Sequence, residues 1–417
     1  MVTPDALTLP RIGVTRIRST TGLVSTGGWS EVPHPSATRL TRVNEIEIGR
    51  GKRGRRAYSF DDIAVVPSRR TRDPEEVSVG WQIDAYHFDL PVIAAPMDSV
   101  MSPQSAIAFG QHGGLPVLDL EGLWTRYPDP QPLLDEIAAL APERATARMQ
   151  EIYREEIQPE LIVERLRQVR DAGVTVAGAL SPQRTQQFWR TVVDAGVDMF
   201  VIRGTTVSAE HVSGRAEPLN LKRFIYELDV PVIVGGVASY TPALHLMRTG
   251  AAGVLVGFGG GAAHTTRRTL GIHAPIASAI ADVAAARRDY LDESGGRYVH
   301  VIADGGVGTS GDIVKAIACG ADAVMLGAAL ARSTEAPGQG FHWGPEAHHG
   351  DLPRGERRRL QTAQLRRERE HFFPRCFRTA ENRLQRRPVV SLPCENLFRP
   401  RDGLFVGFQP VVPFAGR

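Results

Sequence analysis

The sequence predicts an α/β protein with the (β/α)8 TIM-barrel fold, and three observations lead to that prediction. Short apolar segments alternate with amphipathic helical segments through most of the 417-residue chain. The apolar segments have no polar face, which is typical of parallel strands buried on both sides. Eight of them fall within roughly 250 residues, the size and strand number of this barrel. A doubly wound open sheet is the competing architecture.

The expected strands are short and rich in valine, isoleucine and alanine. They lie at 92–95, 115–118, 174–179, 199–202, 232–234, 253–256, 299–303 and 323–326. Helices are expected between them, among others at 102–111, 159–172, 183–195, 240–249 and 311–319. Several of these helices end in Ala-Gly or Cys-Gly, which suits a left-handed glycine after the last turn. The stretch 133–170 is longer than the rest, and we expect it to hold more than one helix.

The two ends of the chain differ in composition from its middle. Residues 1–42 are rich in Ser, Thr, Gly, Pro and Arg without periodicity, so we expect a disordered or miscalled extension. Residues 43–350 hold the predicted barrel as a single domain. A basic run at 49–56 is expected to be a solvated turn, with a nucleic-acid or phosphate arm as the alternative. Residues 351–417 carry several arginine pairs, and the hypotheses for them are a reading-frame slip or a genuine basic interaction tail.

The composition narrows the class of protein. Hydrophobic residues make up 42% of the chain and charged residues 23%, as in soluble globular proteins. The net charge of +3 is too small and too scattered to indicate a specific nucleic-acid partner. Cys319, Cys376 and Cys394 form no paired spacing, which argues against disulfides and a metal site. Without a long apolar segment or a signal-peptide core, we expect a cytoplasmic protein with no membrane partner.

The segment 252–270 is the candidate catalytic loop. A short apolar strand there runs into Gly257, Gly259 and Gly261, and His264 and Thr266 follow. Glycines let backbone N–H groups approach a ligand, and the loops after barrel strands form the catalytic face. A flexible connector has the same composition, so the loop is a weak signal without its neighbours.

A phosphate site is predicted at the loops after the last two strands. Asp304 ends the seventh strand and Gly306 follows it, while Gly327 ends the eighth. In barrels these two loops commonly bind phosphate through backbone N–H groups at a helix N-terminus. Asp304 would lie over the barrel mouth, where a carboxylate can accept hydrogen bonds from a ribose. A helix cap at Asp304 and ordinary glycine turns are the alternative interpretation.

Together these motifs resemble the IMP dehydrogenase / GMP reductase family over about residues 43–348. The resemblance is carried by Ser-Phe-Asp-Asp at 59–62, Pro-Met-Asp-Ser-Val at 96–100, the glycine loop at 257–267, Asp-Gly-Gly at 304–306, Gly-Ala-Asp-Ala-Val-Met-Leu-Gly at 320–327 and Thr-Glu-Ala-Pro-Gly at 334–338. The CBS pair that many members insert after the second strand is absent. The chain is therefore most similar to the IMP-dehydrogenase-related branch made of the barrel alone.

The resemblance implies an oxidoreductase of purine nucleotide metabolism and GMP biosynthesis. Hydride would pass between C2 of a purine nucleoside monophosphate (IMP, XMP or GMP) and NAD or NADP. A homotetramer and a bound monovalent cation are implied as well. The residues implied for catalysis are His264, Thr266 and Glu335; for the nucleotide, Met97, Gly261, Asp304, Gly306 and Gly327; and for the dinucleotide, Arg203, Gly257 and Gly259.

The sequence departs from the family pattern at the nucleophile. His264 stands where the family has the cysteine that attacks C2, and imidazole is a poor substitute for a thiolate. Cys319 is expected on the other side of the barrel, so it does not replace the missing thiol.

Other family positions also differ. Ala95, Ala262 and Ala328 replace serines of the family pattern. Arg203 replaces the aspartate that binds the cofactor ribose, which would favour the 2′-phosphate of NADP or exclude the dinucleotide. Two hypotheses follow: an oxidoreductase with a mechanism modified around His264, and a catalytically silenced purine-nucleotide-binding protein. A flavin enzyme, which would use the same phosphate corner, is a third.

Overall fold

The structure is a computed structural model, and it describes residues 45–66, 77–214, 217–350 and 356–360. The chain divides into two compact units, Met1–Arg56 and Ala57–Arg417. In the first unit β1 (Glu45–Gly49) and β2 (Lys52–Arg55) form an antiparallel hairpin. The basic run at 49–56 therefore supplies a turn with solvated charges, as expected, and also a strand that the sequence did not indicate. The extension 1–42 lies outside the described residues.

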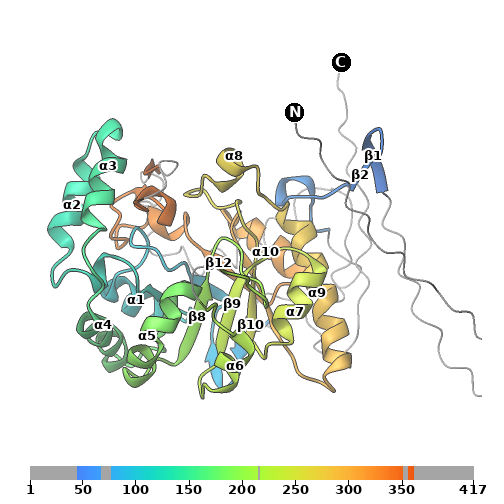
Figure 1. Cartoon of the computed structure of the whole chain (residues 1–417), viewed down its shortest axis with the longest axis horizontal. Coiled ribbons are helices and arrows are strands. Elements are labelled where there is room, and N and C mark those ends of the chain that lie inside the picture. The colour runs from blue at the N-terminus through green and yellow to red at the C-terminus, as the bar shows by residue number, and fades with distance from the viewer. Residues whose placement is uncertain (1–44, 67–76, 215–216, 351–355, 361–417) are drawn as a thin grey trace, which may run out of the picture. The chain divides into compact units, whose positions relative to one another are not determined.

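The second unit is a closed ring of eight parallel strands surrounded by helices (Figure 1). Its strands are β5 (Val92–Ala94), β6 (Val117–Asp119), β7 (Ala177–Leu180), β8 (Met199–Arg203), β9 (Val232–Val237), β10 (Gly253–Val256), β11 (His300–Asp304) and β12 (Ala323–Leu326). They follow one another in the order β5-β12-β11-β10-β9-β8-β7-β6. The ring closes where the amide of Ala94 donates to the carbonyl of Leu115 (2.9 Å) and the amide of Leu115 to that of Val92 (3.0 Å). This confirms the (β/α)8 barrel and excludes the open sheet.

The outer helices begin where the sequence provides start signals. Proline occupies the first turn of α1 (Pro103–Gln111), α4 (Pro159–Asp171) and α5 (Pro182–Asp194), where its missing N–H costs nothing. The others that flank the ring are α6 (Leu221–Tyr226), α7 (Tyr240–Met247), α8 (Thr266–Leu270), α9 (Ile276–Glu293) and α10 (Ser310–Ala318). The long stretch at 133–170 divides into α2 (Gln131–Ala139), α3 (Pro142–Ile152) and α4, as expected. In Figure 1, α2 and α3 stand at the same end of the barrel as α8.

Short elements complete the unit. A hairpin of β3 (Trp81–Ile83) and β4 (Tyr86–Phe88) lies at the N-terminal ends of the strands, where Trp81 Nε1 donates to Nδ1 of His300 (3.2 Å). Single-turn helices lie before the hairpin at η1 (Phe60–Asp62) and after it at η3 (Leu123–Thr125) and η4 (Leu330–Arg332). The last elements are β13 (Phe341–His342), η5 (Pro345–Ala347) and β14 (Arg358–Arg359). Because β14 pairs with β13, part of the predicted tail segment packs on the barrel unit.

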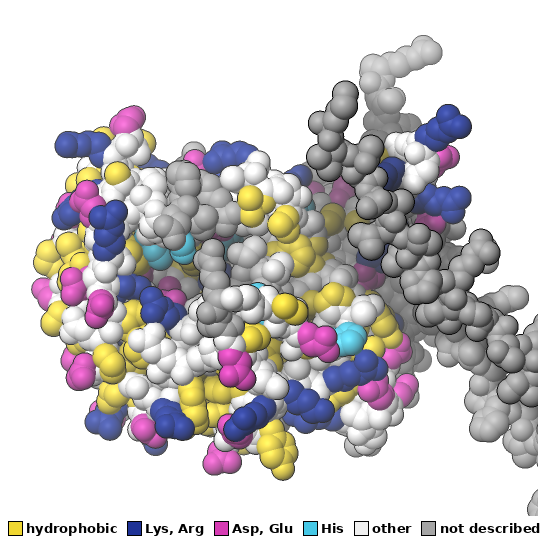
Figure 2. Space-filling model, viewed as in Figure 1, with side chains coloured by type: hydrophobic (Ala, Val, Ile, Leu, Met, Phe, Trp, Pro, Cys, Tyr) yellow, Lys and Arg dark blue, Asp and Glu magenta, His cyan; other side chains and the backbone are white. Residues whose placement is uncertain are grey.

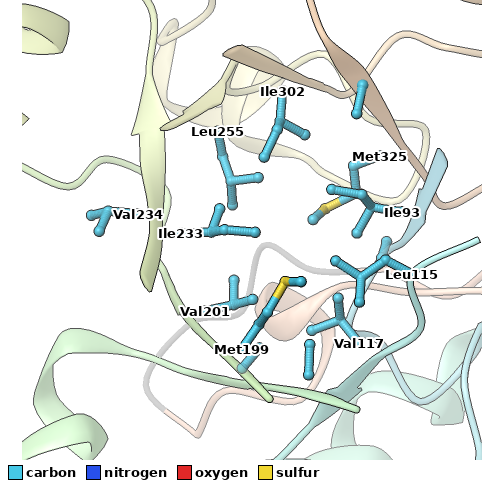
Figure 3. Close-up of a cluster of buried hydrophobic side chains, with 14 of the residues drawn as sticks. Ile93, Leu115, Val117, Met199, Val201, Ile233, Val234, Leu255, Ile302 and Met325 are labelled. Atoms are coloured by element: carbon cyan, nitrogen blue, oxygen red, sulfur yellow. The ribbon is translucent and has the colours of Figure 1, made fainter. Parts of the chain in front are cut away.

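The barrel interior is filled by side chains from alternate strand positions. Ile93, Val201, Leu255, Ile302 and Met325 are buried and meet inside the ring (Figure 3). Since successive strand residues point to opposite faces, the residue two positions beyond each of these also points inward, at the C-terminal mouth. Those mouth residues are small or charged: Ala95, Arg203, Gly257, Asp304 and Gly327.

A second, smaller core lies beneath α2 and α3. It joins them to the segment 341–348 near the end of the barrel unit. Its buried members are Leu123, Leu134, Ile137, Met149, Ile152, Tyr153, Trp343 and Ala347.

On the face shown in Figure 2, basic and acidic side chains are interspersed over the described surface. Among the described residues, no helix combines the length and the apolar character that crossing a bilayer requires.

Candidate functional site

The loop after β10 touches the loop after β11. Gly257 has φ +127°, and a Cβ on it would lie 2.2 Å from the carbonyl oxygen of Asp304. A Cβ on Gly260 would lie 3.8 Å from the amide nitrogen of Gly306, and one on Gly305 would lie 3.1 Å from the amide nitrogen of Gly261. The two backbones therefore approach at distances that leave little room for side chains. The predicted catalytic loop and the predicted phosphate loop thus meet at one place.

His264 follows this loop, and both of its ring nitrogens have partners. Its Nδ1 lies 3.1 Å and 3.0 Å from the two carboxylate oxygens of Glu346. Its Nε2 lies 3.4 Å from Nη2 of Arg203. Thr266 donates from Oγ1 to Oε1 of Glu346 (2.9 Å). One carboxylate therefore holds both the histidine and the threonine of the loop.

Glu346 is the main site residue that sequence reasoning missed. It lies on η5, and its side chain is only 6% exposed. Burial alone would raise its pKa, but the hydrogen bonds that it accepts from His264 and from the Thr266 hydroxyl outweigh burial and hold the pKa at about 2. The residue is thus an anion. The only sequence signal near it is a cluster of aromatic residues and histidines at 341–349, which has neither strand nor helix periodicity.

Glu335, the carboxylate predicted from the resemblance, lies in the exposed segment after η4. Its Oε1 accepts a hydrogen bond from its neighbour Thr334 (3.0 Å). The carboxylate that contacts His264 and Thr266 is that of Glu346. The catalytic role of Glu335 stays a prediction.

Arg203 and Asp304 form an ion pair in the mouth. Nε of Arg203 lies 3.9 Å from Oδ2 of Asp304, and the two side chains are 14% and 20% exposed. The carboxylate predicted to bind ribose therefore has a partner within the chain. Asp304 does not cap α10, because Thr309 is the N-cap and forms a capping box with Asp312. The helix-cap interpretation of Asp304 is wrong.

Two further carboxyl groups lie inside the mouth. Asp98 follows the buried Met97, and its Oδ2 accepts from the amide of Leu123 (2.9 Å) and from Tyr153 Oη (2.7 Å). Among the described residues its Oδ1 has no hydrogen-bond partner, and burial raises the pKa of Asp98 to about 6. Burial and the charge of Asp98 also raise the pKa of Asp119, at the end of β6. These groups resist ionisation more strongly than exposed aspartates.

The loop after β12 reaches the same mouth. A Cβ on Gly327 would lie 3.4 Å from Nε2 of His342 and 3.7 Å from Cβ of Ala95. The other ring nitrogen of His342 hydrogen-bonds to Ser99 Oγ (2.9 Å). Burial, followed by the neighbouring basic side chains of His264 and Arg203, lowers the pKa of His342 to about 3, so this imidazole stays neutral near neutral pH.

The structure thus brings most of the predicted site residues to one end of the barrel. Gly306 is exposed there, with φ +75°. The buried Cys319 lies at the end of α10, a helix that ends at the N-terminal side of the ring, as expected. The site residues gathered at the mouth are Met97, Arg203, Gly257, Gly259, Gly261, His264, Thr266, Asp304, Gly306 and Gly327. Their individual roles remain predictions.

Comparison with known proteins gives one consistent family. The model of the IMP dehydrogenase / GMP reductase domain matches residues 57–348. An uncharacterised oxidoreductase of Mycolicibacterium smegmatis is 53% identical over 316 residues, covering 74% of this chain and 84% of that protein. Inosine-5′-monophosphate dehydrogenase of Methanocaldococcus jannaschii is 27% identical, covering 68% of this chain and 74% of that protein.

The fold comparison agrees with the sequence comparison. The crystal structure of an IMP dehydrogenase/GMP reductase-like protein from Corynebacterium glutamicum superposes with a TM-score of 0.72 at 51% identity. The match covers 76% of this chain and 84% of that one. With its barrel, its glycine loops and this family match in agreement, the chain belongs to the IMP dehydrogenase / GMP reductase family of oxidoreductases.

Proposed function

We propose that the protein is a purine nucleotide oxidoreductase that transfers hydride between C2 of a purine nucleoside monophosphate and NAD or NADP. The observation that carries the proposal is the meeting of three turns, beginning at Gly257, Asp304 and Gly327, at one barrel mouth beside His264. A site assembled from these loops suits a phosphorylated ligand whose base reaches the barrel axis. Family membership supports the reaction class.

The barrel mouth contains a protein group suited to each part of a nucleotide. The exposed backbone at Gly306 would bind phosphate, Asp304 would accept from ribose hydroxyls, and Met97 would pack against the base. A bound nicotinamide dinucleotide would supply the hydride acceptor or donor. Arg203 lies 3.4 Å from His264, so its guanidinium would contact the reacting end of the ligands rather than a remote 2′-phosphate. Its position therefore gives no preference between NAD and NADP.

A silenced nucleotide-binding protein is the second candidate, and one observation favours it. Both His264 and Asp304 are already paired within the chain, to Glu346 and Arg203. A ligand would have to share or displace these partners. Such a protein would bind the nucleotide without turning it over.

Calorimetric titration of the full chain with IMP, XMP and GMP, followed by nicotinamide absorbance assays, separates these candidates. We expect a monophosphate to bind, Asp304→Asn to weaken its binding, and one nucleotide–dinucleotide pair to show hydride transfer. Binding without an absorbance change at any pH would leave the silenced protein as the function. Absence of nucleotide binding would contradict both, and flavin absorbance in the purified protein would support the flavin alternative.

A further inference from the structure

The partners of His264 determine which of its nitrogens carries a proton. The Arg203 guanidinium has N–H donors and no acceptor, so Nε2, which lies 3.4 Å from Nη2, has to accept. The proton of the neutral ring is therefore on Nδ1, where the Glu346 carboxylate accepts it at 3.0 Å. In this tautomer the lone pair of Nε2 faces Arg203 in the mouth.

The carboxylate on the other side of the ring is fixed in place. Glu346 accepts from Thr266 as well as from His264, so neither oxygen turns freely. The backbone of Gly344 closes over the pair: a Cβ there would lie 2.8 Å from Oε2 of Glu346 and 3.1 Å from Nδ1 of His264. The side chain of His264 is 22% exposed, compared with 6% for Glu346. The histidine is therefore more open to solvent than the carboxylate.

A carboxylate, an imidazole held through Nδ1, and an Nε2 lone pair that meets only the long 3.4 Å contact from Arg203 are the parts of a general-base dyad. We propose that His264 and Glu346 activate a water molecule for direct attack on C2 of the purine, so that the enzyme forms no covalent adduct with its substrate. Glu346 is a positioning residue here, because it acts through His264. The inference rests on the proposed function and deepens it, since it assigns the replaced nucleophile a different task.

The step balances with the reactants of the proposed function. Water gives a proton to Nε2 of His264, and its oxygen forms a bond to C2. The hydrogen on C2 leaves with its electron pair to the oxidised nicotinamide, and the proton on His264 passes to solvent. The products are the 2-oxopurine nucleotide and the reduced dinucleotide. The substrate must therefore carry hydrogen at C2, which selects IMP-like nucleotides over GMP.

Arg203 adds an electrostatic contribution at the point of attack. Its guanidinium lies beside Nε2, where hydroxide would form, and its Nε lies 3.9 Å from Oδ2 of Asp304. A fixed cation at that position would stabilise the developing negative charge. The covalent mechanism that the family uses would need a thiolate at this point instead.

The test combines substitutions in and outside the dyad with NMR, kinetic and mass-spectrometric measurements. Glu346→Gln keeps the size of the side chain but lets an amide N–H donate to Nδ1, which favours the wrong tautomer of His264. Nitrogen NMR of the labelled free protein should show the proton on Nδ1 in the wild type and a shift toward Nε2 in this variant. We expect kcat to fall about a thousand- to ten-thousand-fold with little change in KM.

Glu293→Gln is the matched control, since it removes an exposed carboxylate that pairs with Arg248 on the outer surface of the barrel. It should leave both the tautomer and kcat unchanged. Thr266→Val, which keeps the charge of Glu346 and removes one hydrogen bond, should lower kcat far less than Glu346→Gln. Retained thermal unfolding temperatures would show that the losses are not due to unfolding.

Mass spectrometry after acid quench during turnover separates this inference from the proposed function. Wild-type protein should carry no nucleotide, whereas His264→Cys should accumulate a purine adduct. Turnover with an adduct on His264, or an unchanged tautomer and kcat in Glu346→Gln, would overturn the dyad while the proposed function stands. A wild-type protein without turnover would overturn both.

Discussion

Asp98 is an acid that the fold keeps in an unfavourable environment for ionisation. It is 3% exposed, and one of its oxygens has no hydrogen-bond partner within the part of the chain that the structure describes. Its other oxygen accepts from Tyr153 and Leu123, which ties the loop after β5 to the region beneath α2 and α3. Because burial raises its pKa to about 6, the folded protein binds a proton more tightly here than the unfolded chain does.

This raised pKa predicts how stability depends on pH. With a folded pKa of about 6 and an unfolded pKa of 3.8, the contribution of Asp98 is fully present below about pH 4 and is lost as pH rises to about 6. Asp98→Asn should remove this dependence of stability on pH. The unfolding free energy of the variant minus that of the wild type should therefore change by roughly 1–3 kcal/mol between about pH 4 and about pH 6. Denaturant unfolding at several pH values measures it.

Asp171→Asn, at an exposed position on α4, is the control and should run parallel to the wild type. A constant difference between Asp98→Asn and the wild type across this pH range would contradict the prediction.

At the scale of elements, the site depends on the packing of α2 and α3 against the segment 341–348. Trp343 is 2% exposed, and its Nε1 donates to Tyr153 Oη (3.1 Å), the hydroxyl that donates to Asp98. The ring of His348 stacks on Tyr153 at a centroid distance of 3.6 Å. Glu346 lies between Trp343 and His348, so this packing sets where the carboxylate meets His264.

Removing the indole should therefore loosen the site. Trp343→Ala should cost about 3–5 kcal/mol of unfolding free energy, as expected for a large buried aromatic side chain. Hydrogen exchange should increase at 131–152 and 341–348 before it increases elsewhere, and turnover should fall because Glu346 is no longer fixed. Exchange mass spectrometry locates the effect.

Trp81→Ala is the comparison, because Trp81 is 5% exposed but lies at the opposite end of the barrel, against His300. It should destabilise the protein without selective exchange at α2 and α3. Equal exchange patterns in the two variants would mean that the segments are not coupled.

Whether a site residue could be predicted from the sequence depends on the kind of element that carries it. Residues at the ends of strands, such as Arg203, Asp304 and Gly327, follow from period-two alternation once the strands are recognised. Glu346 does not, because it lies on a single-turn helix in an irregular segment. Its contact with His264 spans 82 residues of sequence and depends on packing around Trp343. No local pattern encodes such a contact.

At the scale of the whole barrel, the eight strands were predictable because each is apolar throughout and is followed by turn residues. Boundaries moved by a few residues, and β9 extends to Val237, beyond the expected end at 234. Short elements such as α6, η5 and β13 could not be predicted, since their residues carry no periodic signal over so few positions.

A substitution at Gly257 tests whether the loops after β10 and β11 must stay in close contact. A side chain there would meet the backbone of Asp304 at 2.2 Å, and φ +127° is unfavourable for any other residue. Gly257→Ala should therefore push the ends of β10 and β11 apart, lower the unfolding free energy and abolish nucleotide binding. Denaturant unfolding and calorimetry check both results.

Gly271→Ala is the matched variant, with φ +70° and nothing within 4 Å of the added Cβ. It should cost only about 1–2 kcal/mol from the left-handed backbone. A similar small cost for Gly257→Ala would mean that the two loops can separate freely.

The core beneath α2 and α3 has a consequence for how relatives of this protein could exchange parts. Many family members, by the resemblance, carry a regulatory CBS pair in the connection from β6 to β7. In this chain the same connection contains α2 and α3, which share a buried core with Trp343. A chimaera that grafted such a pair in place of residues 131–152 would expose Trp343 and release the segment 341–348 that carries Glu346. Gaining or losing that module would therefore require rebuilding the closing segment of the barrel at the same time.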